Sequence, residues 1–473
     1  MARGGVVQRV RVAAVLVSVG VAGSQAASYL LNVVAARLLV PASFGELGSL
    51  LAVLVVGAVP AMGLQTVAAL RVARLRQRGP LSTRDAGQLF SLGLATSAVV
   101  TTVVLGAAPL LVILLHLASV WPVVFVAASL MSITLIGLCY GVLQGTQRFT
   151  ALAVLLAVEA VGRIGGTVVG LVLTRGATGA LAATAIGAAV VATIGWVVCR
   201  RPRPAGAVTA DVGGSIGGSR FPLAKRRSSR IPGCTWVDRQ RRRREAGPSR
   251  DPANVGGHRT THHKGHVGEV LHAVQAMLAL VLLVNLDLVL ARHHLDPHQA
   301  GEYAVGAVVT KIAYWLPQAV AILVLPRLAS AQGRRTAIPW ALGICAALDT
   351  VVVLAAATMG PTVVGIIGGA DYRDAAIPIW PFAVVGSMLS LVQILLFSRI
   401  ASADRRSTVL LWLAVAVEIG LVTTWLHDGL TQVVTAAVIA TALLVLAGAA
   451  VELRSRRLEP VDAPGHDGGR GQQ

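Results

Sequence analysis

The sequence is poor in charge, in aromatic side chains and in cysteine. Charged residues make up 13% of its 473 positions and aromatic residues 4%, whereas 55% of it is hydrophobic and its mean hydropathy is +0.73. A chain this apolar cannot bury its surface in one water-exposed core, so a soluble globular protein is excluded. The few cysteines are dispersed, without the spacing of a disulfide framework or a metal site. They are Cys139, Cys199, Cys234 and Cys345.

Enzyme signatures are also missing. The sequence contains neither a P-loop nor a nucleophile elbow. The longest loop expected outside the membrane, around residues 359–375, is too short to hold the active site of a membrane polymerase or ligase. We therefore expect a protein that is not an enzyme and that needs no cofactor.

Long apolar runs make up most of the chain. Twelve of them are near or above the ~20 residues that a helix needs to cross hydrocarbon, where helices also satisfy the backbone polar groups. They predict an all-α polytopic membrane protein with about 12 transmembrane helices. The expected spans are residues 12–38, 45–70, 88–115, 119–143, 150–174, 177–199, 269–291, 302–328, 337–358, 376–398, 408–426 and 430–452.

One pattern occurs twice, once in each half of the chain. Ala36-Arg37 and Pro41-xxx-Gly45-Glu46 match Ala291-Arg292 and Pro297-xxx-Gly301-Glu302, with a one-residue gap between the two parts. Duplicated architectures of this kind are usual in secondary transporters. We expect two six-helix lobes related by an internal pseudo-two-fold repeat. The predicted parts are an N-terminal lobe (1–199), a basic linker (200–266), a C-terminal lobe (267–452) and a tail (453–473).

Positive charge is concentrated in alternate loops. The chain has 41 Lys and Arg against 21 Asp and Glu, a formal charge of +20, and 35 of the 41 cations fall on one side if the N-terminus is cytoplasmic. The positive-inside rule then predicts a protein of the cell membrane with both termini in the cytoplasm. Attraction to anionic lipids is a secondary consequence. A nucleic-acid partner is not expected, because no basic fold with interleaved aromatic residues lies outside the spans.

Residues 200–266 differ from the rest of the chain. They hold 16 basic and 4 acidic residues with almost no apolar periodicity, which predicts disorder. Contact with the inner leaflet and translation from a shifted reading frame are both compatible with this composition. Without cysteine partners or an ordered scaffold, we expect no metal site at its histidines. These are His258, His262, His263 and His266.

Polar residues inside the N-terminal spans form two groups. Gln25, Ser28 and Asn32 follow a helical spacing of three and four, so they either make interhelical hydrogen bonds or line a cavity. Glu159 and Arg163 are one turn apart in the fifth span. They form either a structural ion pair or a functional site, because charges at bilayer depth are rare.

The C-terminal half carries a cation at a similar depth. Lys311 lies about 15 Å from the outer end of its span, and Arg163 is also near the middle of its helix. Trp315 and Gln318 share the face of Lys311. A cation, an aromatic plane and an amide on one face could bind phosphate, sugar and a hydrogen-bonding group. The alternative is that Trp315 packs and that Lys311 pairs with Asp287.

Embedded carboxylates are candidates for binding a coupling ion. Besides Glu159, the chain places Asp287, Asp349 and Glu418 within apolar spans. Carboxylates that titrate during exchange are the basis of ion-coupled antiport.

The duplicated hairpins carry a resemblance to a known family. The pattern from Ala36 to Leu47, and its counterpart from Asn285 to Tyr303, resemble polysaccharide biosynthesis proteins of the oligosaccharide flippase family, within the MATE-like multidrug/oligosaccharidyl-lipid/polysaccharide exporter superfamily. The resemblance implies two lobes, a central cavity, and alternating access that moves a lipid-linked saccharide to the outer leaflet. Arg163 and Lys311 would then face the pyrophosphate of a polyprenyl carrier.

The flippase interpretation implies a lipid-linked saccharide as substrate and glycan-assembly enzymes as partners. The alternative within the same superfamily is a cation- or proton-coupled antiporter of drugs or other small molecules. The cavity candidates are Gln25, Asn32, Arg163, Lys311, Trp315 and Gln318, and the coupling-ion candidates are Glu159, Asp287, Asp349 and Glu418.

Overall fold

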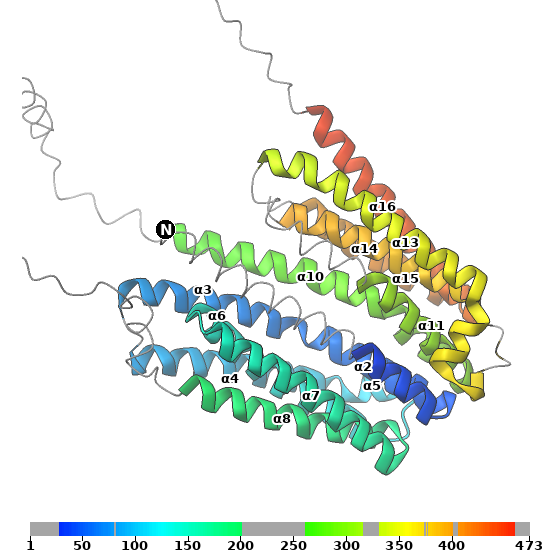
Figure 1. Cartoon of the computed structure of the whole chain (residues 1–473), viewed down its shortest axis with the longest axis horizontal. Helices are drawn as coiled ribbons and strands as arrows, with labels where there is room; N and C mark the ends of the chain where they lie inside the picture. The colour runs from blue at the N-terminus through cyan, green and yellow to red at the C-terminus, as the bar shows by residue number, and fades with distance from the viewer. Residues whose placement is uncertain are drawn as a thin grey trace, which may run out of the picture. The chain divides into compact units, whose positions relative to one another are not determined.

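The computed structural model describes residues 28–79, 82–200, 261–315, 331–372, 375, 377–400 and 405–458. The chain separates into two units, residues 1–199 with 269–473 and residues 200–268. Within the described ranges all regular structure is helical (Figure 1). The predicted all-α fold class is therefore confirmed.

The helices follow the apolar runs of the sequence. Ten described helices are long and apolar enough to cross a membrane, and Ser28–Leu38 is a shorter apolar helix. Three of the twelve expected spans are described only in part: 12–38, 302–328 and 376–398, which lacks only its first residue. After Ser28–Leu38 the order is α2 (Pro41–Gly57), α3 (Val59–Arg78), α4 (Thr83–Gly106), α5 (Ala108–Leu114), α6 (Trp121–Gly145), α7 (Phe149–Thr174), α8 (Ala177–Arg200), α10 (Thr261–His294), α11 (Pro297–Trp315), α13 (Ala331–Gly368), η2 (Ala370–Tyr372), α14 (Ile379–Ile400), α15 (Arg405–Thr424) and α16 (Leu430–Leu458).

In both lobes the fourth span packs against the second and third spans. In the first lobe α6, its fourth span, packs against α2, α3, α4, α5 and α7, and in the second lobe α14, also the fourth span, packs against α11, α13 and α16 (Figure 1). The lobes meet where α2 packs along α11. The duplicated sequence pattern thus corresponds to a duplicated arrangement of helices.

Within the described residues three spans are interrupted, and each interruption lies two residues before a proline. A proline lacks the N–H that would bond to residue i−4 and its ring clashes with that carbonyl, so the helix breaks or bends just before it. The second span breaks before Pro60, whereas Pro317 in the corresponding span of the second lobe lies outside the described residues. The interruptions are Ala58 before Pro60, Ala107 before Pro109 and Met359 before Pro361.

One predicted boundary differs from the structure. Helix α10 begins at Thr261, inside the stretch 200–266 that composition predicted to be disordered. A helix can extend beyond the hydrocarbon into water, where polar residues do not destabilise it. Hydropathy alone therefore places the start of α10 too late in the sequence. Residues 201–260 of the predicted linker lie outside the described residues, as do His258 and Cys234.

Candidate functional site

In the first lobe, Arg163 on α7 contacts the first helix. Its Nη2 donates a hydrogen bond to Ser28 Oγ over 2.7 Å, and Asn32 Nδ2 donates to the Ser28 carbonyl oxygen over 2.8 Å. At Ser28, the polar stripe of the first helix therefore faces Arg163 on α7. Gln25, the remaining member of the predicted stripe, lies outside the described residues.

Glu159, one turn before Arg163, accepts a hydrogen bond from a residue that sequence reasoning did not select. The hydroxyl of Tyr140, on α6, donates to Glu159 Oε2 over 2.6 Å. Tyr140 is buried within the first lobe. Glu159 is thus hydrogen-bonded to Tyr140 of α6, while Arg163 is hydrogen-bonded to Ser28 of the first helix.

In the second lobe, a buried polar cluster forms where α10, α11 and α15 meet. Asp287 accepts hydrogen bonds from the Tyr303 hydroxyl at Oδ2 (3.0 Å) and from the Leu288 amide at Oδ1 (2.8 Å). Glu418 lies close enough to Asp287 for their charges to interact, and both of its carboxyl oxygens are buried without a hydrogen-bond partner among the described residues. Two carboxyls withdrawn from water must either bind protons or have a compensating cation, because isolated buried charge is costly.

Lys311 belongs to the same cluster. It is half-buried on α11 and interacts electrostatically with Asp287, but it makes no ion pair within 4.0 Å in the part of the chain that the structure describes. Trp315, one turn further, packs on the core and lies with its ring edge-on to Tyr314, 5.2 Å between centroids. Gln318 lies outside the described residues. The structure brings Lys311 together with Asp287, Tyr303 and Glu418.

Asp349 occupies a different place. It lies on α13 and accepts a hydrogen bond from Ser390 Oγ of α14 at Oδ2, over 2.7 Å. The candidate carboxylates of the second lobe are thus divided between a pair, Asp287 and Glu418, and a single group that is already bonded to the neighbouring helix.

The two embedded cations lie at similar depth. Lys311 is 14 residues from Pro297, the start of α11, and Arg163 is 12 residues before Arg175, which follows α7. At 1.5 Å per residue these separations are about 21 Å and about 18 Å. Each lobe therefore contributes one cation at a similar distance from an end of its helix.

Comparisons with known proteins identify the fold. The chain matches no protein-family model and no curated protein sequence. Among solved structures it is similar to an inward-facing multidrug resistance MATE family transporter of the MOP superfamily, with a TM-score of 0.63 and 14% identity over 92% of this chain and 96% of that one. It is similar to the lipid II flippase MurJ in an inward closed conformation, with a TM-score of 0.62 and 14% identity over 94% and 88%. An outward-facing MATE family transporter matches with a TM-score of 0.57, again at 14% identity, over 95% and 96%.

These matches extend over nearly the whole of both chains. The protein has the two-lobed, twelve-helix fold of MOP-superfamily transporters, and its apolar helices make it a multi-pass membrane protein. At 14% identity the likeness concerns the fold, so the choice of substrate depends on the residues of the site.

Proposed function

We propose that the protein is a flippase that moves a polyprenyl-pyrophosphate-linked oligosaccharide across the cell membrane, by alternating access, for the assembly of a surface polysaccharide. The observation that carries this proposal is the pair of cations, Arg163 and Lys311, at similar depth in the two lobes. The activity is transport without covalent chemistry or a cofactor. Its partners would be the lipid-linked saccharide, glycan-assembly enzymes and the anionic lipids that attract the basic stretch 200–266.

The physical requirement comes from the pyrophosphate. A charged group in hydrocarbon is strongly destabilised unless fixed opposite charge or water compensates it. An ammonium and a guanidinium, one from each lobe, provide that compensation at the depth where it is needed most. A solved structure with the same fold is described as a lipid II flippase, so a lipid-linked substrate is compatible with this architecture.

A second function is supported by the carboxylates. Asp287 and Glu418 lie together in a buried cluster, and the oxygens of Glu418 have no partner among the described residues. A proton or a small cation would compensate their charge, as in a cation- or proton-coupled antiporter. Solved MATE family transporters with this fold are described as multidrug resistance proteins.

Replacing Lys311 tests the flippase. Lys311→Ala should lower export of the surface glycan by at least about tenfold at unchanged membrane abundance, because one charge-assisted contact to phosphate is lost. Lys311→Arg should keep part of the activity, since the charge persists while the donor geometry changes. Arg175→Ala removes an exposed cation from the turn after α7 and is the matched control. Full export by Lys311→Ala at normal abundance would favour the antiporter.

Asp287→Asn distinguishes a substrate cation from a structural ion pair. If Lys311 serves mainly to neutralise Asp287, both Lys311→Ala and Asp287→Asn should reduce the amount of folded protein in the membrane. If Lys311 binds phosphate, Asp287→Asn should leave more export than Lys311→Ala. Surface glycan and membrane abundance are measured together for each variant.

A further inference from the structure

The two copies of the duplicated pattern meet each other in the structure. At the contact between α2 and α11, a Cβ added to Gly45 would lie 2.8 Å from the backbone nitrogen of Gly301, and one added to Gly301 would run into the carbonyl oxygen of Pro41. Only glycine lets two helix backbones approach this closely. The repeat-related glycines therefore form the crossing point between the lobes.

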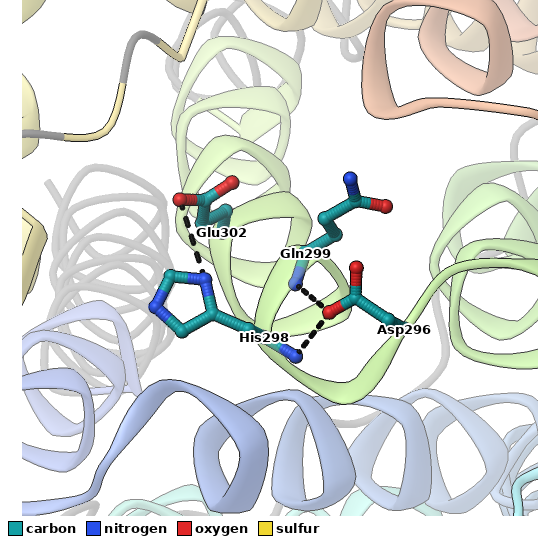
Figure 2. Close-up of polar contacts among 4 residues, drawn as sticks. All are labelled: Asp296, His298, Gln299 and Glu302. Atoms are coloured by element: carbon teal, nitrogen blue, oxygen red, sulfur yellow. Dashed lines mark hydrogen bonds and ion pairs between the residues drawn. The ribbon is translucent and has the colours of Figure 1, made fainter.

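The start of α11 is held in place by its own side chains. Figure 2 shows Asp296 Oδ1 accepting hydrogen bonds from the backbone N–H groups of His298 (2.9 Å) and Gln299 (3.1 Å), while His298 Nδ1 lies 3.6 Å from Glu302 Oε1. An acidic side chain in this position satisfies donors that have no partner within the helix. The cap fixes the first turn of α11, and with it the position of Gly301.

The repeat-related arginines reach into opposite lobes. Arg37, at the end of the first span, donates from Nη2 (2.6 Å) and Nε (3.1 Å) to the carbonyl oxygen of Ile366, in the last turn of α13. Arg292, at the end of α10, donates from Nε to the carbonyl oxygen of Leu115, directly after α5, over 3.1 Å. Each guanidinium thus meets the end of the other lobe's third span.

Helix ends are suitable acceptors for these arginines. The last carbonyls of a helix lack partners within it and carry its partial negative charge, which favours a cation. When such a contact parts, water can satisfy both the guanidinium and the carbonyl. The bonds are therefore strong enough to hold the lobes and weak enough to exchange for hydration.

A further contact lies beside Arg292. The ring of His293 stacks on that of His116, with centroids 5.4 Å apart, and His293 Nδ1 lies 3.0 Å from the carbonyl oxygen of Leu114. The last residue of α5 and the two residues after it thus contact two consecutive residues of α10. Arg292 is buried, whereas Arg37, its counterpart, is exposed.

We propose that the duplicated pattern is a gate: Arg37, Gly45, Arg292 and Gly301, with their acceptors Ile366 and Leu115, form a clasp that closes the two lobes at one end of the bundle and parts when the transporter opens there. The charge asymmetry of the loops puts this end at the outer face. The inference rests on the proposed transport function, because a gate acts only where the lobes alternate between two arrangements.

Cross-linking across the clasp tests the gate. In full-length protein with its native cysteines replaced, the pair His116→Cys and His293→Cys is joined by a short bis-methanethiosulfonate. Cross-linking should abolish transport, and reduction should restore it. The control pair Arg71→Cys and Gln88→Cys, whose parent side chains are hydrogen-bonded over 3.0 Å within the first lobe, should cross-link without stopping transport. Full transport with the clasp cross-linked would overturn the proposal.

The arginines are tested by the cross-linking rate of the His116→Cys and His293→Cys pair without substrate. Arg292→Ala should lower that rate about tenfold, and the exposed Arg37→Ala about threefold, because a charge-assisted hydrogen bond is lost in each. Arg175→Ala, at the same end of the bundle, should leave it unchanged. If Arg292→Ala does not reach the membrane, Arg37→Ala decides the outcome. An unchanged rate in the arginine variants would refute the clasp, whereas a lowered rate in a protein that exports no glycan would refute only the flippase.

Discussion

Among the described residues of the second lobe, Glu418 is the buried side chain with the least compensation. It is 1% exposed and both of its oxygens lack a hydrogen-bond partner among the described residues, whereas Asp349, 4% exposed, accepts a bond from Ser390. A buried carboxyl that the protein does not satisfy is costly to keep. Its retention beside Asp287 is understandable if a transported or coupling cation completes the site.

This difference predicts separate effects for two isosteric changes. Glu418→Gln should reduce the response of transport to an imposed sodium or proton gradient at least about tenfold, since each 1.4 kcal/mol of lost cation binding is tenfold in affinity. Asp349→Asn should keep that response, because the amide oxygen still accepts from Ser390. Substrate movement in proteoliposomes, with each gradient applied in turn, measures both variants. Equal gradient responses of Glu418→Gln and the parent protein would rule out Glu418 as the coupling residue.

Single residues of the site were predictable from the sequence to the extent that they were chemically unusual. Lys311, Asp287 and Glu418 stand out because charge is rare in an apolar helix. The tyrosines that bond to embedded carboxylates do not stand out: Tyr140, which donates to Glu159, and Tyr303, which donates to Asp287, are ordinary residues of membrane helices, and the sequence contains no signal for which helix a tyrosine faces. Those pairings depend on packing between spans, which periodicity within one span does not determine.

At the scale of helices, α6 shows how close packing organises a lobe. Its glycines at four-residue spacing bring it against the backbone of α3, where a Cβ on Gly141 would run into the Gln65 carbonyl oxygen and lie 2.7 Å from the Ala68 Cβ. Small residues on one face allow helices to approach within the membrane, where van der Waals contact replaces the hydrophobic effect between them. The stripe consists of Gly137, Gly141 and Gly145.

Gly141→Ala should therefore destabilise the protein. A methyl group that must displace backbone costs about 1–3 kcal/mol, so the variant should unfold at a lower temperature in detergent. Gly165→Ala is the matched control, because a Cβ at that helical position meets nothing within 4 Å. Thermal unfolding followed by size-exclusion chromatography compares the two. A melting temperature of Gly141→Ala equal to that of Gly165→Ala would contradict this packing.

The sequence predicted which runs are helical better than where the helices end. The expected span 337–358 is part of α13, which extends from Ala331 to Gly368, and the span 88–115 is divided between α4 and α5. Hydropathy reports the hydrocarbon core, whereas helices continue into water and bend at prolines. A proline such as Pro60 is a usable signal in a sequence, because its effect on the backbone is local.

At the scale of the whole molecule, the repeat predicted two equivalent lobes but not how they touch. Duplication makes the lobes equivalent in sequence. The close contact of Gly45 with Gly301, and the hydrogen bonds of Arg37 and Arg292 to the opposite lobe, are visible only in the folded structure. The residues that made the repeat recognisable are the same ones that hold the lobes together. The side of the membrane on which they lie remains a prediction from loop charge.

Two exposed positions at opposite ends of the bundle test that topology. His298 lies in the first turn of α11 with a side chain 63% exposed, and Arg84 is exposed in the first turn of α4. Because most cations fall on the side of Arg84, a membrane-impermeant maleimide should label His298→Cys in intact cells and Arg84→Cys only after permeabilisation. The parent protein, labelled in parallel, controls for its native cysteines. The reverse pattern would invert the topology and make the clasp a cytoplasmic gate, with its contacts unchanged.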